Sequence, residues 1–322
     1  MKNLFRHVLA AAIFAAATAS SAQSYPAKPL RLVVPFAAGG AIDSYARMLG
    51  QKLTEAWKQQ VIVDNRPGAG ATIGADNVAK SAADGYSFLI TPHSFAVAPN
   101  IYRKLPYDPV RDFAPVTLLS ASFLILTASQ KLPVASLREL ITIAKSKPGS
   151  INYGSTGIGT STHLAAELLN IKTEIDMVHV PYKGDSPQVA ALLAGEVQVG
   201  FGPLTGMIGH VKANRLRALG ITAARRSASF PDMPTIAEAG IPGFELNTWT
   251  GILGPAGIPQ DAAAKFQAEA VKILAMPDIR DRLAGWGEEP VGSNAQDFAA
   301  RLKSDLALYG TIIKQARIPL QD

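Results

Sequence analysis

Short apolar runs alternate along this chain with longer stretches in which apolar residues recur every three or four positions. The first pattern is typical of buried strands and the second of amphipathic helices. Their alternation predicts α/β units with mostly parallel sheets. Strands are predicted at residues 30–35, 60–64, 86–90, 116–119, 123–127, 151–154, 177–181, 197–201 and 218–222. Helices are predicted at residues 42–59, 73–81, 137–147, 161–169, 187–193, 261–275, 278–284 and 294–315.

The length of the chain predicts two lobes. It has 322 residues, and a single hydrophobic core stops growing at about 250–300 residues. Because no low-complexity linker interrupts the chain, we expect it to cross between lobes at packed strands near 123–127 and 245–249. Such crossings act as hinges around an interlobe ligand cleft. This places residues 23–122 and 246–322 in a discontinuous first lobe and residues 123–245 in the second.

The N-terminus predicts export. Residues 1–22 read as a cleaved signal peptide, with Lys2 and Arg6 at the start, an apolar run over 8–19 and small residues at 20–22. The alternative is an uncleaved membrane anchor, but an apolar run of about 12 residues falls short of the roughly 20 that span a bilayer. We therefore expect a mature protein outside the cytoplasm, in the periplasm if the cell is Gram-negative.

Composition narrows the function further. The net charge is +6, of which Lys2 and Arg6 contribute two, and no dense basic cluster with interleaved aromatic residues is present. Nucleic acid is therefore not an expected partner. The chain has no cysteine, which excludes thiol catalysis and a lipid-modified N-terminal cysteine.

Two glycine-rich turns lie where a predicted strand meets a predicted helix. The first ends in Gly39 and Gly40, and the second runs through Gly154, Gly157 and Gly159. A helix start exposes unpaired N–H groups and a partial positive charge, so it binds anions. Two such turns, one in each lobe, would suit a small molecule with a carboxylate at each end.

Several residues in or near these turns have two possible roles. Gly39 and Gly40 either let a ligand approach the backbone or only form a tight turn. Ser155 and Thr160 can donate hydrogen bonds to a carboxylate, and Thr160 can equally cap its helix. Asp43 either pairs with a ligand amino group or complements the helix dipole.

Strand ends contribute further candidates, since α/β sheets bind ligands at the carboxyl ends of their strands. Thr91, His93 and Ser94 follow the strand at 86–90, and residues 202–205 follow the strand at 197–201. Asp185 follows the strand at 177–181, where it would select a ligand donor, repel a second carboxylate or remain a solvated loop acid.

The motifs of catalysis are missing. There is no G-x-S-x-G sequence, Ser155 and His163 are eight residues apart without a nearby Asp, and no P-loop occurs. The histidines after the signal peptide, His93, His163, His179 and His210, lack metal-ligand spacing. We expect no catalytic residue, no cofactor and no metal, with an exported serine hydrolase as the rival hypothesis.

Ordered sequence strings support a family resemblance. They include PFAAGGAIDSYAR at 35–47, NRPGAG at 65–70, ADGY at 83–86, YGSTGIGT at 153–160 and VPYKG at 180–184. Across essentially the whole mature chain, this order resembles the substrate-binding proteins of tripartite tricarboxylate transporters, the Bordetella uptake gene (Bug) family.

The resemblance implies a two-lobed periplasmic binding-protein fold of type II-like α/β architecture that closes on an organic acid. It also implies delivery to integral-membrane transporter subunits, for which a monomer is the simple expectation; presentation to a sensor is the alternative. The implied ligands are di- or tricarboxylates, aromatic acids and amino acids. With the strand-end candidates, the expected ligand-binding residues are Phe36, Ala38, Gly39, Gly40, Ala41, Thr91, Ser94, Ser155, Gly157, Gly159, Thr160 and Asp185.

Overall fold

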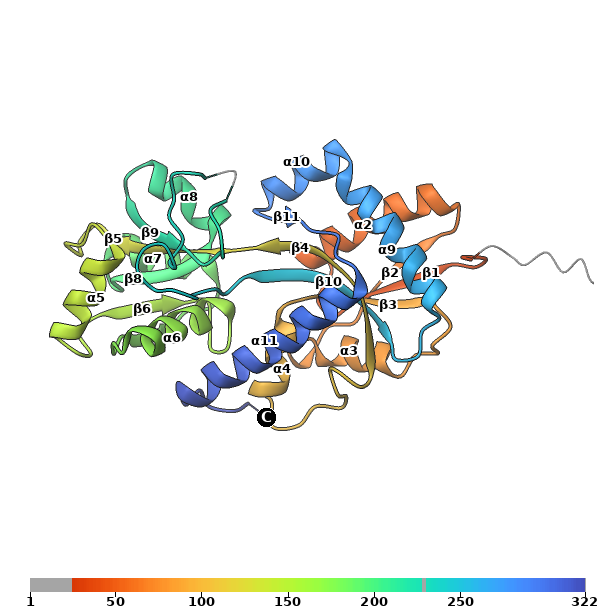
Figure 1. Cartoon of the computed structure of the whole chain (residues 1–322), viewed down its shortest axis with the longest axis horizontal. Helices are drawn as coiled ribbons and strands as arrows, with labels where there is room; N and C mark the ends of the chain where they lie inside the picture. The colour runs from red at the N-terminus through yellow and green to blue at the C-terminus, as the bar shows by residue number, and fades with distance from the viewer. Residues whose placement is uncertain (1–24, 228–229, 322) are drawn as a thin grey trace, which may run out of the picture.

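The computed structural model describes residues 25–227 and 230–321, so the predicted signal peptide lies outside the described residues. Its strands form two separate sheets, one of six strands and one of five. Figure 1 shows these sheets in two lobes placed side by side along the long axis.

The first lobe is built on the six-stranded sheet, with strand order β11-β4-β10-β3-β1-β2. These strands are β1 (Leu30–Val34), β2 (Val61–Asn65), β3 (Ser87–Pro92), β4 (Phe113–Ser122), β10 (Thr248–Pro255) and β11 (Glu289–Pro290). Its helical elements are α2 (Ala41–Trp57), the short 3-10 turn η1 (Ala69–Ala71), α3 (Thr72–Ala79), α4 (Ser94–Ile101), α9 (Gln260–Ala275), α10 (Pro277–Gly285) and α11 (Ala295–Gln315).

The second lobe is built on the five-stranded sheet, with strand order β7-β6-β8-β5-β9. These strands are β5 (Leu124–Ser129), β6 (Asn152–Ser155), β7 (Val178–Pro181), β8 (Val199–Pro203) and β9 (Leu216–Ile221). Its helices are α5 (Leu137–Ser146), α6 (Ser161–Thr173), α7 (Asp185–Ala194) and α8 (Leu204–Lys212).

The expectation of mostly parallel sheets is wrong. The pairs β1–β2, β1–β3, β6–β7 and β6–β8 are parallel, but β10 runs antiparallel to β3 and β4, and β5 runs antiparallel to β8 and β9. The reason is the route of the chain. One strand leaves each lobe toward the other and another returns, so the connecting strands oppose the βαβ units.

The sequence pattern missed helices α4 and α8, the short turn η1 and the two-residue strand β11, and it missed the full extents of β4 and β10. Helix α4 contains Pro99, which removes a helix donor. Helix α8 contains Gly206 and Gly209, which lower helix propensity. The sequence predicts only a short crossing near 245–249, yet strand β10 extends to Pro255 with almost every residue buried.

The chain passes between the sheets through short segments. Only Phe123 separates β4 of the first sheet from β5 of the second, and the chain re-enters the first sheet at Thr248. The exact boundaries at 122/123 and 245/246 stay predictions.

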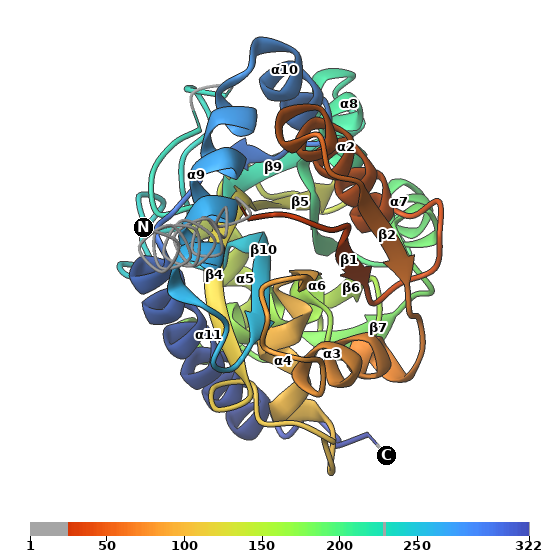
Figure 2. The ribbon, with the colours of Figure 1, turned by 90° about the vertical axis from the view of Figure 1, so that its right-hand side faces the viewer.

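Helix α11 connects the two lobes in a second way. It packs on α4 and β4 in the first lobe and also contacts α6 in the second. Figure 2, seen from the first-lobe side, shows α11 running past β4 and β10 at the edge of the molecule. Gln321, beyond its end, pairs with the backbone of Ile101 and Arg103, so the C-terminal segment is tied to the end of α4.

Candidate ligand-binding site

A cavity of about 280 Å³ lies between α4 of the first lobe and the loop that enters α6 of the second. The first lobe also supplies Phe36, from the loop after β1. The volume is near the lower end of the roughly 300–1,000 Å³ typical of small-molecule sites. The lining residues are Phe36, Gly70, His93, Ser94, Val97, Ala98, Ile101, Tyr102, Ile158, Gly159, Thr160, Ser161 and Gln321.

Two helix starts meet at this cavity, one from each lobe. Helix α4 begins at Ser94 and α6 begins at Ser161, so each helix has a serine as its first residue, and both serines line the cavity. The Ser94 hydroxyl is buried and has no hydrogen-bond partner among the described residues. A buried hydroxyl at a helix start is well suited to an anionic ligand.

The two glycine-rich turns share one local geometry. Gly39 and Gly159 both have left-handed backbone, with φ of 85° and 76°. The next residue in each turn, Gly40 or Thr160, is the extended N-cap of α2 or α6. In each case the glycine N–H is bound by the side chain four residues later.

In the first turn that side chain is Asp43. Its Oδ2 accepts from Gly39 N at 2.8 Å and from Arg47 Nε at 2.9 Å, and its Oδ1 accepts from Asn65 Nδ2 at 2.9 Å. The hydrogen bond from Arg47, assisted by those from Gly39 and Asn65, lowers the pKa of Asp43 to about 2. The carboxylate thus ties its own turn to α2 and to the end of β2, and Asp43 is only 2% exposed.

In the second turn the acceptor is His163. Its Nδ1 accepts from Gly159 N at 3.0 Å, so the ring is neutral and carries its proton on Nε2, 3.8 Å from Glu167 Oε1. Burial, with a smaller contribution from His179, lowers the pKa of His163 to about 3. The imidazole therefore serves as a neutral acceptor at physiological pH.

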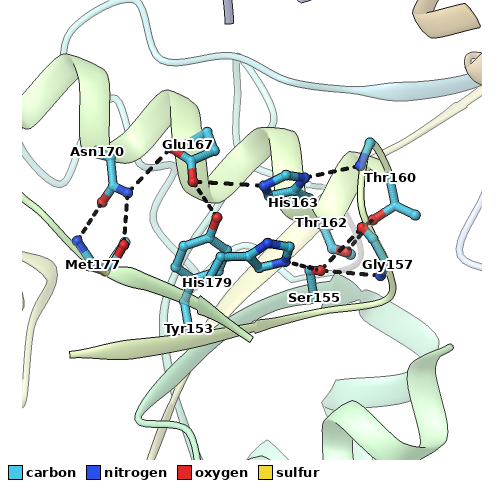
Figure 3. A network of polar contacts seen from close by, with 11 residues as sticks. Tyr153, Ser155, Gly157, Thr160, Thr162, His163, Glu167, Asn170, Met177 and His179 are labelled. Atoms are coloured by element: carbon cyan, nitrogen blue, oxygen red, sulfur yellow. Dashed lines mark hydrogen bonds and ion pairs between the residues drawn. The ribbon is translucent and has the colours of Figure 1, made fainter. Parts of the chain in front are cut away.

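A column of stacked rings supports this histidine (Figure 3). His163 stacks on His179 with ring centres 3.9 Å apart and planes 10° apart, and His179 stacks on Tyr153 at 4.9 Å. Tyr153 Oη donates to Glu167 at the far end of the column. Burial lowers the pKa of His179 to about 4, so neither histidine adds positive charge beneath the loop.

Hydroxyl groups complete the loop through contacts with His179, with the backbone of Gly157 and with one another. Ser155 Oγ lies 2.6 Å from His179 Nε2 and also contacts the backbone of Gly157, and the Ser155 residue is 0% exposed. Thr160 Oγ1 donates to Gly157 O at 2.8 Å and lies 2.9 Å from Thr162 Oγ1. Thr160 occupies the N-cap position by its backbone, but its side chain caps no helix N–H.

The structure brings four of the twelve expected ligand-binding residues to the cavity wall, Phe36, Ser94, Gly159 and Thr160. The remaining eight do not line it. Thr91 and Ser155 are buried, Gly157 is half-buried, and Asp185 is exposed at the start of α7. The other four are exposed in the first turn: Ala38, Gly39, Gly40 and Ala41.

Several residues of the site had no sequence signal. Val97, Ile101, Tyr102 and Gln321 form much of the wall, but they come from a helix interrupted by proline and from the C-terminal segment. The partner of Ser155 was also missed, because the structure places His179 and not His163 against its hydroxyl. Only the neighbouring strands β6 and β7, paired in parallel, bring these two residues together.

Residues 45–318 match the tripartite tricarboxylate transporter family receptor. The chain belongs to this receptor family. A UPF0065 protein encoded in the tcbD–tcbE intergenic region of Pseudomonas sp. strain P51 is 37% identical to this receptor over 324 residues, covering 99% of this chain and 96% of the relative.

Solved structures of similar proteins support the fold of the receptor. Rpa4515 of R. palustris, solved with adipate, is 32% identical, with a TM-score of 0.75 over 92% of this chain and 100% of its own. MatC (Rpa3494) of Rhodopseudomonas palustris, solved with bound malate, is 29% identical, with a TM-score of 0.70 over 90% of this chain and 100% of its own. The predicted periplasmic binding-protein fold is confirmed.

Proposed function

We propose that this receptor binds a small organic carboxylate in the cavity between α4 and the β6–α6 loop and delivers it to the membrane subunits of its transporter. The observation that carries the proposal is the Ser94 hydroxyl. It lines the cavity at a helix start, is buried, and has no partner among the described residues. A buried hydroxyl without a partner costs free energy, which a bound carboxylate would recover.

The relatives support the ligand class. Rpa4515 was solved with adipate and MatC with malate, and both are dicarboxylates. In this chain Ser94 and Ser161, the first residues of α4 and α6, would bind the ligand carboxylate together with the N–H groups at these helix starts. The sequence-based candidates that lie away from the cavity, Asp185 among them, would contribute if the lobes close further.

A binding role also fits Ser155 better than catalysis does. Its hydroxyl contacts His179, as in a hydrolase, but the residue has no exposed surface from which to attack a substrate. Among residues 25–227 and 230–321, no carboxylate bonds to His179. We infer that the Ser155–His179 contact stabilises the loop and that this receptor catalyses no reaction.

We further infer that the mature protein is a periplasmic monomer from which residues 1–22 have been cleaved. No helix in the described part of the chain has the length and apolar character needed to cross a bilayer. Presentation of the same ligand to a sensor is the alternative, and neighbouring permease or kinase genes would separate the two.

A thermal-shift screen of residues 23–322 tests the proposal, with carboxylates compared against sugars and cationic ligands. Binding to the native state alone stabilises it by about 2.7 kcal/mol at one hundred times the dissociation constant. We expect a rise in melting temperature with carboxylates, and in Ser94→Ala a loss of affinity of roughly 1.5–3 kcal/mol, the value of a hydrogen bond to a charged group. A response to sugars or cations, with none to acids, would refute the proposal.

A further inference from the structure

The turn between β1 and α2 has no polar side chain of its own. Its residues 37–41 are alanines and glycines, and all five are exposed. Gly40, the N-cap of α2, provides no side-chain cap. Phe36, which precedes these residues, is half-buried and lines the cavity. The side-chain hydrogen bonds that shape this turn therefore come from outside it.

Asn65, the last residue of β2, supplies two of these hydrogen bonds. Its Nδ2 donates to Phe36 O at 3.1 Å and to Asp43 Oδ1 at 2.9 Å. The parallel pairing of β1 and β2 places Asn65 opposite Val34, two residues before Phe36. Asn65 is not among the residues that line the cavity. It reaches the cavity wall through the backbone of Phe36.

Helix α2 closes these contacts into a ring. Arg47 Nη2 donates to Asn65 Oδ1 at 3.2 Å, and Arg47 Nε donates to Asp43 Oδ2 at 2.9 Å. Asp43 also accepts from Gly39 N at 2.8 Å. The amide of Asn65 thus faces two acceptors with its nitrogen and a donor with its oxygen, as its chemistry requires. The ring holds the turn at two points, Phe36 and Gly39.

We propose that Asn65 is a positioning residue for ligand binding, which sets through the Phe36 carbonyl where the first-lobe wall of the cavity lies. This inference rests on the proposed function and adds to it a residue that does not touch the cavity. Binding sites depend on supporting residues that hold the contacting groups within about 0.5 Å of their productive positions. Without the two donors of Asn65, the turn is released at Phe36.

The isosteric variant Asn65→Asp tests the inference. At pH 7.5 its ionised carboxylate cannot donate to Phe36 O or to Asp43. At lower pH a protonated carboxyl group can donate again, and contact with the Asp43 carboxylate favours that proton. We expect the variant to bind a carboxylate found by thermal shift at least tenfold more weakly than wild type at pH 7.5. That ratio should shrink at least threefold by pH 5.

The charged neighbours of Asn65 are known on each adjoining element. Asp43 and Arg47 lie on α2, and the flanking Asp64 and Arg66 pair with each other at 3.0 Å. In wild type the hydrogen bond from Arg47 lowers the pKa of Asp43 to about 2, so Asp43 stays charged between pH 7.5 and 5. Ionisation of the ligand itself cancels in the ratio of variant to wild type at each pH.

Two control variants separate positioning from a general loss of structure. Asn65→Ala removes the same donors without adding a carboxyl group, so its affinity should be at least tenfold weaker at both pH values. Asn77→Asp makes the isosteric change elsewhere in the first lobe. Asn77 Oδ1 accepts from Arg31 Nη1 at 2.9 Å, and Asn77 does not line the cavity. Its affinity should equal that of wild type at both pH values.

A double-variant cycle tests whether Asn65 acts through Phe36. Calorimetric titration should show that Asn65→Ala costs at least tenfold in affinity in wild type and less than threefold in Phe36→Ala. Equal costs in the two backgrounds, or wild-type affinity in folded Asn65→Ala, would overturn the inference and leave the carboxylate receptor standing. A wild-type protein that binds sugars and no carboxylate would overturn the proposed function as well.

Discussion

At the scale of single residues, the two glycine-rich turns are held by side chains whose roles the sequence does not decide. The sequence allows Asp43 to be either a ligand partner or a dipole-stabilising acid, and in the structure its carboxylate accepts hydrogen bonds from Gly39, Arg47 and Asn65. His163 holds Gly159 in the same way. A sequence shows that such residues lie near a helix start, but the acceptor geometry depends on the positive φ of the preceding glycine.

The pH dependence of stability tests the neutral state of His163. A histidine whose folded pKa lies below its unfolded value favours folding above the unfolded pKa, and this stability is lost as pH falls toward the folded pKa. For His163 that window runs from about pH 6.5 to about pH 3. His179 and His93 titrate in an overlapping window, with pKa values of about 4.

We expect His163→Asn, which keeps an acceptor near Gly159, to remove one titrating group from this pH dependence. Between pH 5.5 and 4 the unfolding free energy of the variant should fall less steeply than that of wild type. The two slopes should differ by about 1.4 kcal/mol per pH unit. Urea unfolding at several pH values measures the slopes. Parallel slopes would mean that His163 is already protonated in the folded protein.

At the scale of elements, the strand-to-helix turn before α6 fits tightly against α4. A Cβ on Gly159 would lie 2.1 Å from Ile101 Cδ1, across the boundary between the lobes. The sequence predicted this turn and α6 correctly, because apolar periodicity and glycine mark both. It did not predict α4, whose internal Pro99 obscures the helical pattern, and so it missed the surface on which the turn rests.

We expect Gly159→Ala to lower ligand affinity at least tenfold, because the added methyl group holds the turn away from Ile101. Gly149→Ala is the matched control. Gly149 has nearly the same φ, 73° against 76°, but has nothing within 4 Å of an added Cβ. Both variants should lose about 1–2 kcal/mol of stability through left-handed strain, and titration should show reduced affinity in Gly159→Ala alone. Equal affinities in the two variants would show that the contact between the turn and α4 does not contribute to ligand binding.

At the scale of the whole molecule, α11 holds the segment that returns from the second lobe. Arg301 Nε donates to both carboxylate oxygens of Asp305 at 2.9 Å, and its guanidinium also reaches Glu245 at 3.5 Å and Asn247 O at 3.3 Å. Asp305 in turn accepts from Trp249 Nε1 at 2.6 Å. Alternating apolar runs predicted two lobes, but nothing in the sequence pairs residue 301 with residues 245–249, since this contact exists only in the assembled molecule.

We expect Arg301→Met to destabilise the protein by about 3–5 kcal/mol, because it leaves the buried Asp305 carboxylate without its cation. The double variant Arg301→Met/Asp305→Leu should recover part of that loss. Urea unfolding of both variants and of wild type provides the comparison. A double variant less stable than Arg301→Met would show that the ion pair is not the source of the effect.

The central claim, that an organic acid binds between α4 and the β6–α6 loop, is tested most directly by thiol labelling. The chain has no cysteine, so Ile158→Cys places a single thiol on the cavity wall. Ile62→Cys is its control, since Ile62 lies in β2 away from the cavity and is 45% exposed, against 44% for Ile158. With a saturating acid identified by thermal shift, maleimide should label Ile158→Cys at least tenfold more slowly and Ile62→Cys at an unchanged rate. An unchanged rate at Ile158→Cys, in protein that the acid still stabilises, would place the ligand elsewhere and contradict the account.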